Sequence, residues 1–287
     1  MKKIPELLFG SPGIPSSTEA GQGERNTANG VKQCRKLGLD AMELEWVQSI
    51  NISKERAPEI KKVAEENNIT LTCHGQYFVN LSPTDMTKLK PSMQRMREAA
   101  ERMHEVNGWS ITWHTAFYLG RGKPETYEIV KKNFKSVVKD LHDRGLNNVW
   151  LRPETTGKES QWGDLQECIK LSQDIEGVLP CIDFAHLHAR YNGINNTTEE
   201  FRAIMNQLEK GLGRECLNNM HIQICNIEYT PKGERRHLNL QDTKQFQFNW
   251  KDLLKVWKEY KIKGVVIDES PNIEEDALLL QKHWKAL

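Results

Sequence analysis

The sequence predicts a single α/β domain over residues 1–287, folded as a (β/α)8 TIM barrel. Short apolar segments alternate along the chain with longer segments of helical period, which is the order of elements in a parallel barrel. About eight apolar segments are found, the number that closes such a barrel. The 287 residues contain no Pro/Gly-rich linker, low-complexity segment or long charge block to mark a domain boundary.

Each predicted strand is a short apolar run. In chain order the predicted strands are residues 4–10, 40–46, 69–74, 109–114, 147–154, 178–183, 220–225 and 264–269. Between them, residues 87–106 repeat apolar side chains every three or four positions, so the methionines of this stripe are expected in the core. Residues 124–145 begin with Pro124 and end at Gly145, which are the usual start and stop residues of a helix.

The composition is that of a globular protein. Hydrophobic residues make up 38%, charged residues 28%, and no apolar stretch approaches the roughly 18 residues of a membrane span. The apolar part of MKKIPELLFG is too short for a signal peptide, so we expect a cytoplasmic protein without membrane contacts. The net charge of +1 carries no overall signal for nucleic acid, and a local basic face is compatible with it. Six cysteines without a CxxC pair argue against a zinc ribbon or a disulfide framework.

Residue types that bind metal recur at the ends of the predicted strands. They are His74, His114, Glu154, Asp183, His221 and Glu269. In a parallel barrel the carboxyl ends of all strands open to one mouth, so these side chains are expected to converge there. Carboxylates brought together without a cation repel one another, and nitrogen and oxygen ligands fit zinc or manganese. The pattern therefore predicts a divalent metal site. Glu43 and Glu45 are further candidates for the mouth, with one of them expected on a solvated or structural face.

Several short motifs resemble one known family. They are HGQYFVNLS at residues 74–82, WHT at 113–115, PETTG at 153–157, CIDFAH at 181–186 and IDESP at 267–271. Together they resemble the endonuclease IV family of apurinic/apyrimidinic endonucleases, over most of the chain from about residue 37 to its end. The resemblance implies a TIM barrel with three zinc ions, a monomeric state, and double-stranded DNA containing an abasic site as the partner.

The resemblance also implies roles for the strand-end residues. His74 and His114 would hold one zinc ion, and Glu154 would bridge it to a second. The second ion would also be held by Asp183, His221 and Glu269. Glu154 and Glu269 are the expected catalytic residues, with Glu269 orienting the attacking water.

The third zinc ion implied by the resemblance would be held by His186 and by partners from KGERRHLNL, residues 232–240. Glu234 and His237 are the candidate partners, provided that the loop is one residue longer than in the family pattern. Arg235 and Arg236 are predicted to contact DNA phosphate, since the arginine fork suits phosphate oxygens.

Two adjacent aromatic residues, Tyr77 and Phe78, follow directly on the strand that ends at His74. In the resembled family the equivalent pair penetrates DNA, and such side chains can fill the gap left by a missing base. The alternative is that they pack this loop onto the barrel.

Two other functions compete with incision of DNA on the 5′ side of an abasic site. A sugar isomerase or epimerase of the xylose-isomerase-like barrels would use Glu154, Asp183, His221 and Glu269 around one manganese or magnesium ion. His188 would then contact substrate, whereas it is structural under the endonuclease hypothesis. The joint presence of His74, His114 and His186 favours the endonuclease, because an isomerase does not need them. A third alternative is a barrel that binds DNA or metal without turnover, since the first loop, LLFGSPGIPSS, departs from the family pattern.

Overall fold

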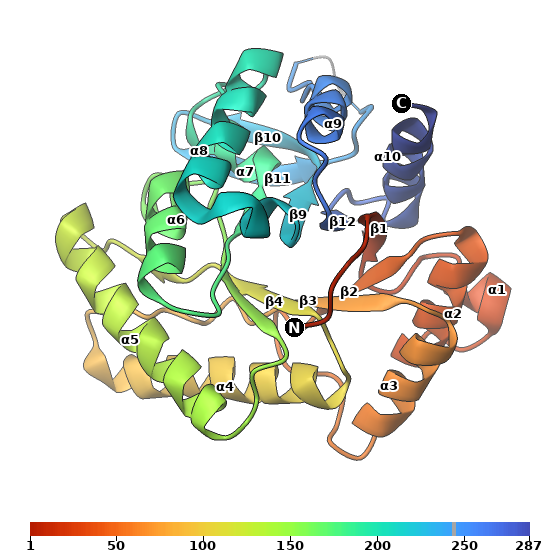
Figure 1. The fold of residues 1–287 in the computed structure, drawn as a ribbon, viewed down its shortest axis with the longest axis horizontal. Coiled ribbons are helices and arrows are strands. Elements are labelled where there is room, and N and C mark those ends of the chain that lie inside the picture. The colour runs from red at the N-terminus through yellow and green to blue at the C-terminus, as the bar shows by residue number, and fades with distance from the viewer. Residues whose placement is uncertain (243–244) are drawn as a thin grey trace.

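The structure, a computed structural model, describes residues 1–242 and 245–287. Eight parallel strands form one sheet that curves into a barrel (Figure 1). In chain order they are β1 (Leu7–Pro12), β2 (Ala41–Glu45), β3 (Thr70–His74), β4 (Ser110–Trp113), β6 (Trp150–Pro153), β8 (Cys181–Asp183), β9 (Met220–Ile224) and β12 (Gly264–Asp268). The neighbour order is β6-β4-β3-β2-β1-β12-β9-β8, and bridges Leu151–Val178 and Glu154–Cys181 join its two ends. The predicted TIM barrel is confirmed.

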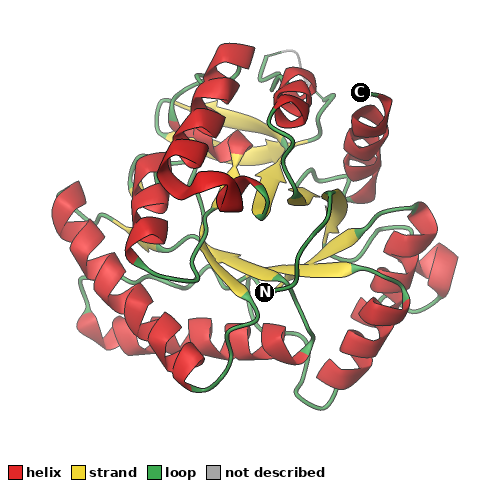
Figure 2. Ribbon diagram, viewed as in Figure 1, coloured by secondary structure: helices red, strands yellow, loops and turns green. Residues whose placement is uncertain are grey.

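Helices surround the strands on the outside of the barrel (Figure 2). They are α1 (Thr18–Gln22), α2 (Thr27–Leu37), α3 (Ala57–Glu66), α4 (Leu89–Glu105, after a 3-10 turn at Met86–Lys88), α5 (Lys123–Asp143), α6 (Leu165–Asp174), α7 (Phe184–Arg190), α8 (Thr198–Leu217), α9 (Trp250–Glu259) and α10 (Glu274–Ala286). Both clearly predicted helices are confirmed as α4 and α5, and Met96 and Met103 of the methionine stripe are fully buried. Among the described helices, none combines the length and apolar composition that a membrane span requires.

Two short antiparallel strand pairs, of which only the second is a hairpin, lie beyond the barrel strands and were not predicted. β5 (Ala116–Phe117) pairs with β7 (Gln161–Trp162), and β10 (Asn226–Thr230) pairs with β11 (Gly233–Leu238). In the β10–β11 hairpin Tyr229 faces Glu234 but Glu228 faces Arg236, so Arg235 is an extra residue in β11. Such a β-bulge shifts the side-chain alternation by one position.

The barrel core is apolar around the outside of the strands and partly polar within. Phe9, Met42 and Ile111 belong to one large hydrophobic cluster of the described residues. Arg152, from β6, is fully buried and donates to Ser110 Oγ (2.6 Å) and Pro180 O (2.9 Å). Polar side chains can occupy the interior here because hydrogen bonds offset the cost of removing them from water.

Candidate metal centre

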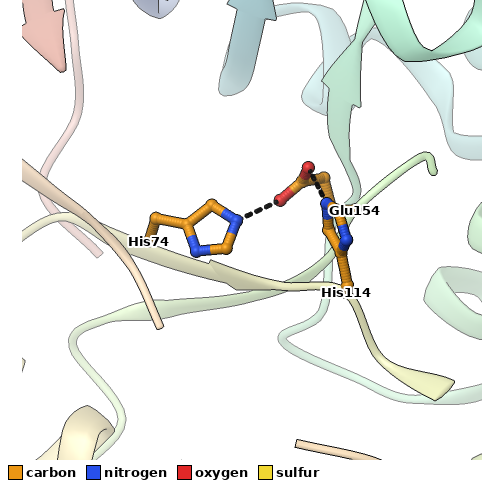
Figure 3. Close-up of side chains that lie close together, drawn as sticks. All are labelled: His74, His114 and Glu154. Atoms are coloured by element: carbon orange, nitrogen blue, oxygen red, sulfur yellow. Dashed lines mark hydrogen bonds and ion pairs between the residues drawn. The ribbon is translucent and has the colours of Figure 1, made fainter. Parts of the chain in front are cut away.

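Three side chains from adjacent strands meet at the mouth of the barrel (Figure 3). His74 ends β3, His114 directly follows β4, and Glu154 directly follows β6. His74 Nε2 lies 3.3 Å from Glu154 Oε2, and His114 Nε2 lies 2.7 Å from Glu154 Oε1. Each carboxylate oxygen of Glu154 thus faces an imidazole from one of these two strands. This is the convergence that strand-end positions in a parallel barrel predict.

The ring of His74 is oriented by its backbone surroundings. His74 Nδ1 lies 2.8 Å from the carbonyl oxygen of Gly75, which leaves Nε2 directed at Glu154. A carbonyl bonded to the second ring nitrogen is the usual arrangement for a histidine that binds metal. Gly75 itself is needed here, because an added Cβ would lie 1.9 Å from Trp113 Nε1.

A second group comprises Glu154, Asp183 and His186, all buried. Asp183 ends β8 and is the N-cap of α7, where its Oδ1 accepts from the backbone N–H of His186 at 2.7 Å. This cap turns the first residues of α7 back over the strand end. His186 Nδ1 consequently lies 3.1 Å from Asp183 Oδ2 and 3.3 Å from Glu154 Oε1.

A third group lies between α7 and the β10–β11 hairpin. His186 Nε2 is 3.6 Å from Glu234 Oε2 and 3.4 Å from His237 Nε2, and His237 Nδ1 is 3.8 Å from Glu269 Oε2. Residues three apart on a regular strand point to opposite faces. The bulge at Arg235 puts Glu234 and His237 on the same side of the β10–β11 hairpin.

Burial and mutual charge shift the protonation of these groups strongly. Burial acts to raise the pKa of Glu154, but His114 and His74 outweigh it and hold this pKa well below its usual value. Burial, with Asp183 and Glu154 adding repulsion, raises the pKa of Glu269 well above its usual value. Burial opposes protonation of His74, yet Glu154 raises its pKa to about 9. Without a cation, therefore, the cluster must hold protons.

The donor set fits divalent cations. Asp183 Oδ2 and Glu234 Oε2 are buried and have no hydrogen-bond partner in the described part of the chain. Buried oxygens of this kind are costly unless a ligand or ion satisfies them. Imidazole and carboxylate together suit zinc and manganese. His74, His114, Glu154, Asp183, His186, Glu234, His237 and Glu269 are the residues positioned to hold such ions.

His221 does not join these groups, contrary to the expected convergence. It is the second residue of β9 and lies in register with Cys181, whereas Gln223 lies in register with Asp183. Two residues of a strand span roughly 6–7 Å, so His221 sits one layer below the mouth. There His221 Nε2 is 3.0 Å from Glu43 Oε2, and Nδ1 is 3.0 Å from Ser110 Oγ.

Gln223 occupies the strand level at which His221 was expected. Its Nε2 donates to Glu43 Oε1 and to Glu269 Oε1, each at 2.8 Å. Sequence reasoning missed this residue because an amide is not a metal-ligand type. Its position could have been found, since Gln223 shares the strand face of His221 and lies two residues nearer the strand end.

Glu43 and Glu45 both lie on β2, but at different levels. Glu43 is the interior partner of His221 and Gln223. Glu45 is in register with His74 at the strand end, and burial together with the charge of Glu43 raises its pKa to about 8. Glu43 is therefore the structural member of the pair, and Glu45 reaches the level of the mouth.

Six of the eight metal-ligand candidates line a cavity of about 250 Å³. It is lined by His74, Tyr77, His114, Phe117, Lys158, Gln161, His186, Glu234, His237 and Glu269. Tyr77 and Phe78 are 53% and 55% exposed, so they are not packed into the barrel, and the Tyr77 ring lies 5.3 Å from that of His74. Tyr77 therefore stands at the rim of the cavity, and Phe78, next to it in the chain, is exposed to solvent.

Arg235 and Arg236 point to one side of the hairpin. Both form ion pairs with Glu228, while their side chains remain 66% and 70% exposed. His188 faces away from the cavity, with Nδ1 2.9 Å from Ile194 O and its ring against Tyr229. This packing is structural, which is the role that His188 has under the endonuclease hypothesis.

Lys158 is the one lysine or arginine among the described residues that line this cavity, and it was not singled out in the sequence. Its loop is held by buried Arg190, which donates to Thr156 Oγ1 (2.9 Å), Lys158 O (2.5 Å) and Gln161 O (3.1 Å). A cation on a fixed loop beside the candidate metal ligands suits an anionic ligand. A lone lysine in a loop carries no sequence signal of this role.

Comparison with known proteins identifies the family. Residues 31–287 match the family described as the xylose isomerase-like TIM barrel. The chain belongs to this family. An uncharacterized protein of Methanocaldococcus jannaschii is 38% identical over 281 residues and aligns with 98% of each chain. A probable endonuclease 4 of Bacillus subtilis is 27% identical over 208 residues, which is 68% of this chain and 63% of the relative.

Solved structures show the same fold. Endonuclease IV from Thermus thermophilus superposes with a TM-score of 0.70 at 18% identity, covering 98% of both chains. A D-tagatose 3-epimerase-like protein superposes with a TM-score of 0.72 at 15% identity, covering 97% of this chain and 96% of the other. At these identities the structural likeness establishes the barrel alone. The Bacillus relative supports the resemblance to endonuclease IV.

Proposed function

We propose that this protein is a metal-dependent phosphodiesterase that incises double-stranded DNA on the 5′ side of abasic sites and leaves a 3′ hydroxyl. The observation that carries the proposal is the convergence of His74, His114 and His186 with the carboxylates of Glu154 and Glu269 around one cavity. Distant relatives named probable endonuclease 4 and apurinic-apyrimidinic endonuclease 1 support it. We assign three divalent ions, with zinc at the histidine-containing positions, to a monomer.

The residues divide the work of phosphodiester hydrolysis. Divalent ions, when bound, supply hydroxide at neutral pH and neutralise the phosphate charge. His74, His114 and Glu154 would hold one ion, and His186, Glu234 and His237 would hold another. Glu269, fixed by the amide of Gln223, would orient the attacking water.

The rim would recognise the lesion. Tyr77 and Phe78, exposed beside the cavity, would fill the space that a missing base leaves in the stack. Lys158 would pair with a phosphate next to the cleaved one, and Arg235 and Arg236 would contact the backbone farther out.

The decisive assay uses an end-labelled DNA duplex with a single tetrahydrofuran abasic analogue and the same duplex without it. Incision 5′ to the analogue, absent from the intact duplex and abolished by EDTA, is the expected result. Parallel reactions with D-tagatose and related ketohexoses test the epimerase alternative. Epimerisation of a sugar without incision of either duplex would reject the proposal.

A further inference from the structure

Exposed apolar side chains gather on one side of the barrel mouth. Of the seven large hydrophobic residues that are exposed in the described part of the chain, Tyr77, Phe78, Met86 and Leu119 lie in the two segments that connect β3 to α4 and β4 to α5. Both segments follow a barrel strand, so both belong to the mouth. Exposed apolar groups that cluster in this way mark a surface that contacts a ligand. Tyr77 and Phe78 already have a role in the proposed function, whereas Leu119 has none.

Leu119 has an unusual backbone conformation. Its φ is 51°, in the left-handed region that a leucine rarely adopts. The neighbouring residues impose it, because the backbone N–H of Tyr118 donates to Ser160 O at 3.2 Å and that of Arg121 donates to Tyr118 O at 3.0 Å. The Tyr118 hydroxyl also donates to Glu167 Oε2 at 2.7 Å. The strained turn leaves Leu119 48% exposed, and strain of this kind collects at sites that contact ligands.

The turn that carries Leu119 is fastened to the segment that carries Tyr77 and Phe78. Arg121 Nη1 donates to Ser82 O at 2.9 Å, and Arg121 Nη2 donates to the carbonyl oxygen of the next residue at 3.2 Å. A guanidinium that bonds two carbonyl oxygens of one segment fixes both its position and its orientation. The three exposed side chains therefore belong to two loops that are held together.

Leu119 also lies close to the candidate metal centre. Phe117, two residues earlier, lines the cavity, and two residues span at most about 7 Å of chain. Ser160, which accepts from Tyr118, is two residues beyond Lys158, the cation of the cavity. An apolar side chain and a cation thus flank the same side of the mouth. This combination suits DNA at a lesion, where phosphates and the faces of unstacked bases are both accessible.

We propose that Leu119 is a further lesion-recognition residue, which packs against a base face exposed beside the abasic nucleotide and does so from a different loop than Tyr77 and Phe78. An intact duplex is fully stacked and offers no such face, so this contact distinguishes damaged from undamaged DNA. The inference rests on the proposed function and extends its substrate recognition.

The test replaces Leu119 with asparagine, which is polar but tolerates the left-handed conformation. Fluorescence anisotropy measures binding of the zinc-loaded full chain to a duplex with one tetrahydrofuran abasic analogue and a phosphorothioate linkage on its 5′ side to slow incision. Leu119→Asn should raise the dissociation constant for this duplex about tenfold and leave that for the intact duplex unchanged. Its urea unfolding midpoint should equal or exceed that of wild type, because the backbone strain is relieved. Weaker binding by a fold that is no less stable excludes unfolding as the cause.

Two further variants serve as controls. Leu119→Met keeps an apolar side chain and should bind the abasic duplex as wild type does. Leu287→Asn changes a leucine of similar exposure, 47%, at the far end of α10, and should also bind as wild type does.

Three results would overturn the inference: unchanged affinity of Leu119→Asn for the abasic duplex, an equal loss for both duplexes, or no preference of wild type for the abasic duplex. If wild type fails to incise DNA while Leu119→Asn selectively loses abasic affinity, the catalytic assignment alone is wrong.

Discussion

Two histidines on opposite walls of the barrel, His74 on β3 and His221 on β9, have contrasting surroundings. Both are buried in strands, and each has a carboxylate close by, with Glu154 3.3 Å from His74 and Glu43 3.0 Å from His221. His74 ends its strand and faces an open cavity, whereas His221 is the second residue of its strand and faces the interior. The level at which strand register places a side chain, rather than its type, decides whether it can bind a ligand.

The largest effect is expected when the carboxylate beside His74 at the mouth is removed. Glu154→Ala should abolish metal retention at the His74–His114 position and lower incision by about 10³-fold or more, since lost charge stabilisation alone costs about 10²–10³-fold. Elemental analysis and single-turnover incision measure the two effects. Glu98→Ala, on the exposed face of α4, is the control. Unchanged metal content in Glu154→Ala would place the ions elsewhere.

Replacing His221 and His74 one at a time tests whether the first stabilises the fold and the second binds metal. Burial acts to raise the pKa of Glu43, but His221 outweighs it, so Glu43 is ionised. His221→Leu leaves that charge without its partner and should cost about 3–5 kcal/mol of unfolding free energy. Urea denaturation of the metal-free protein measures this loss.

The metal content should respond in the opposite way. The folded fraction of His221→Leu should bind as much metal as wild type, while His74→Ala should lose one zinc with a smaller loss of stability. Loss of metal from His221→Leu, with His74→Ala unaffected, would reverse the assignment of mouth and interior.

Much of this arrangement follows from local sequence, and the remainder follows from register. His74, His114 and Glu154 are predictable because each ends or directly follows an apolar run, and parallel strands end at one mouth. His221 also lies in such a run. The run alone does not determine the register with the neighbouring strands, so the level of His221 in the barrel could not be predicted. The bulge at Arg235 in the β10–β11 hairpin could not be predicted either, because a bulge is defined by how two strands pair.

The two mouth histidines His74 and His186 have raised pKa values when metal is absent. Burial opposes protonation of His186, but Asp183 and Glu234 raise its pKa to about 10, as Glu154 raises that of His74 to about 9. These raised values stabilise the metal-free fold fully below about pH 6.5, and the contribution fades as pH rises through 9 to 10.

Zinc must displace those protons. At pH 7 we expect at least two protons, those of His74 and His186, to be released on loading, and an apparent zinc affinity that rises with pH. Titration calorimetry in buffers of different ionisation enthalpy measures the release. Zinc binding without proton release would contradict raised pKa values at His74 and His186.

The smallest effect is expected at Lys158. It is tested by comparing a substitution in the cavity loop with one at an exposed lysine on the surface. Lys158→Gln should weaken binding of abasic duplex several-fold and lower the slope of log affinity against log salt by about 0.9, the change for one phosphate contact. Lys132→Gln, exposed on α5, should change neither value. Because Arg190 bonds the backbone of this loop, the substitution leaves the loop in place. An unchanged salt slope in Lys158→Gln would therefore mean that this lysine does not contact phosphate, whatever happens to the rate.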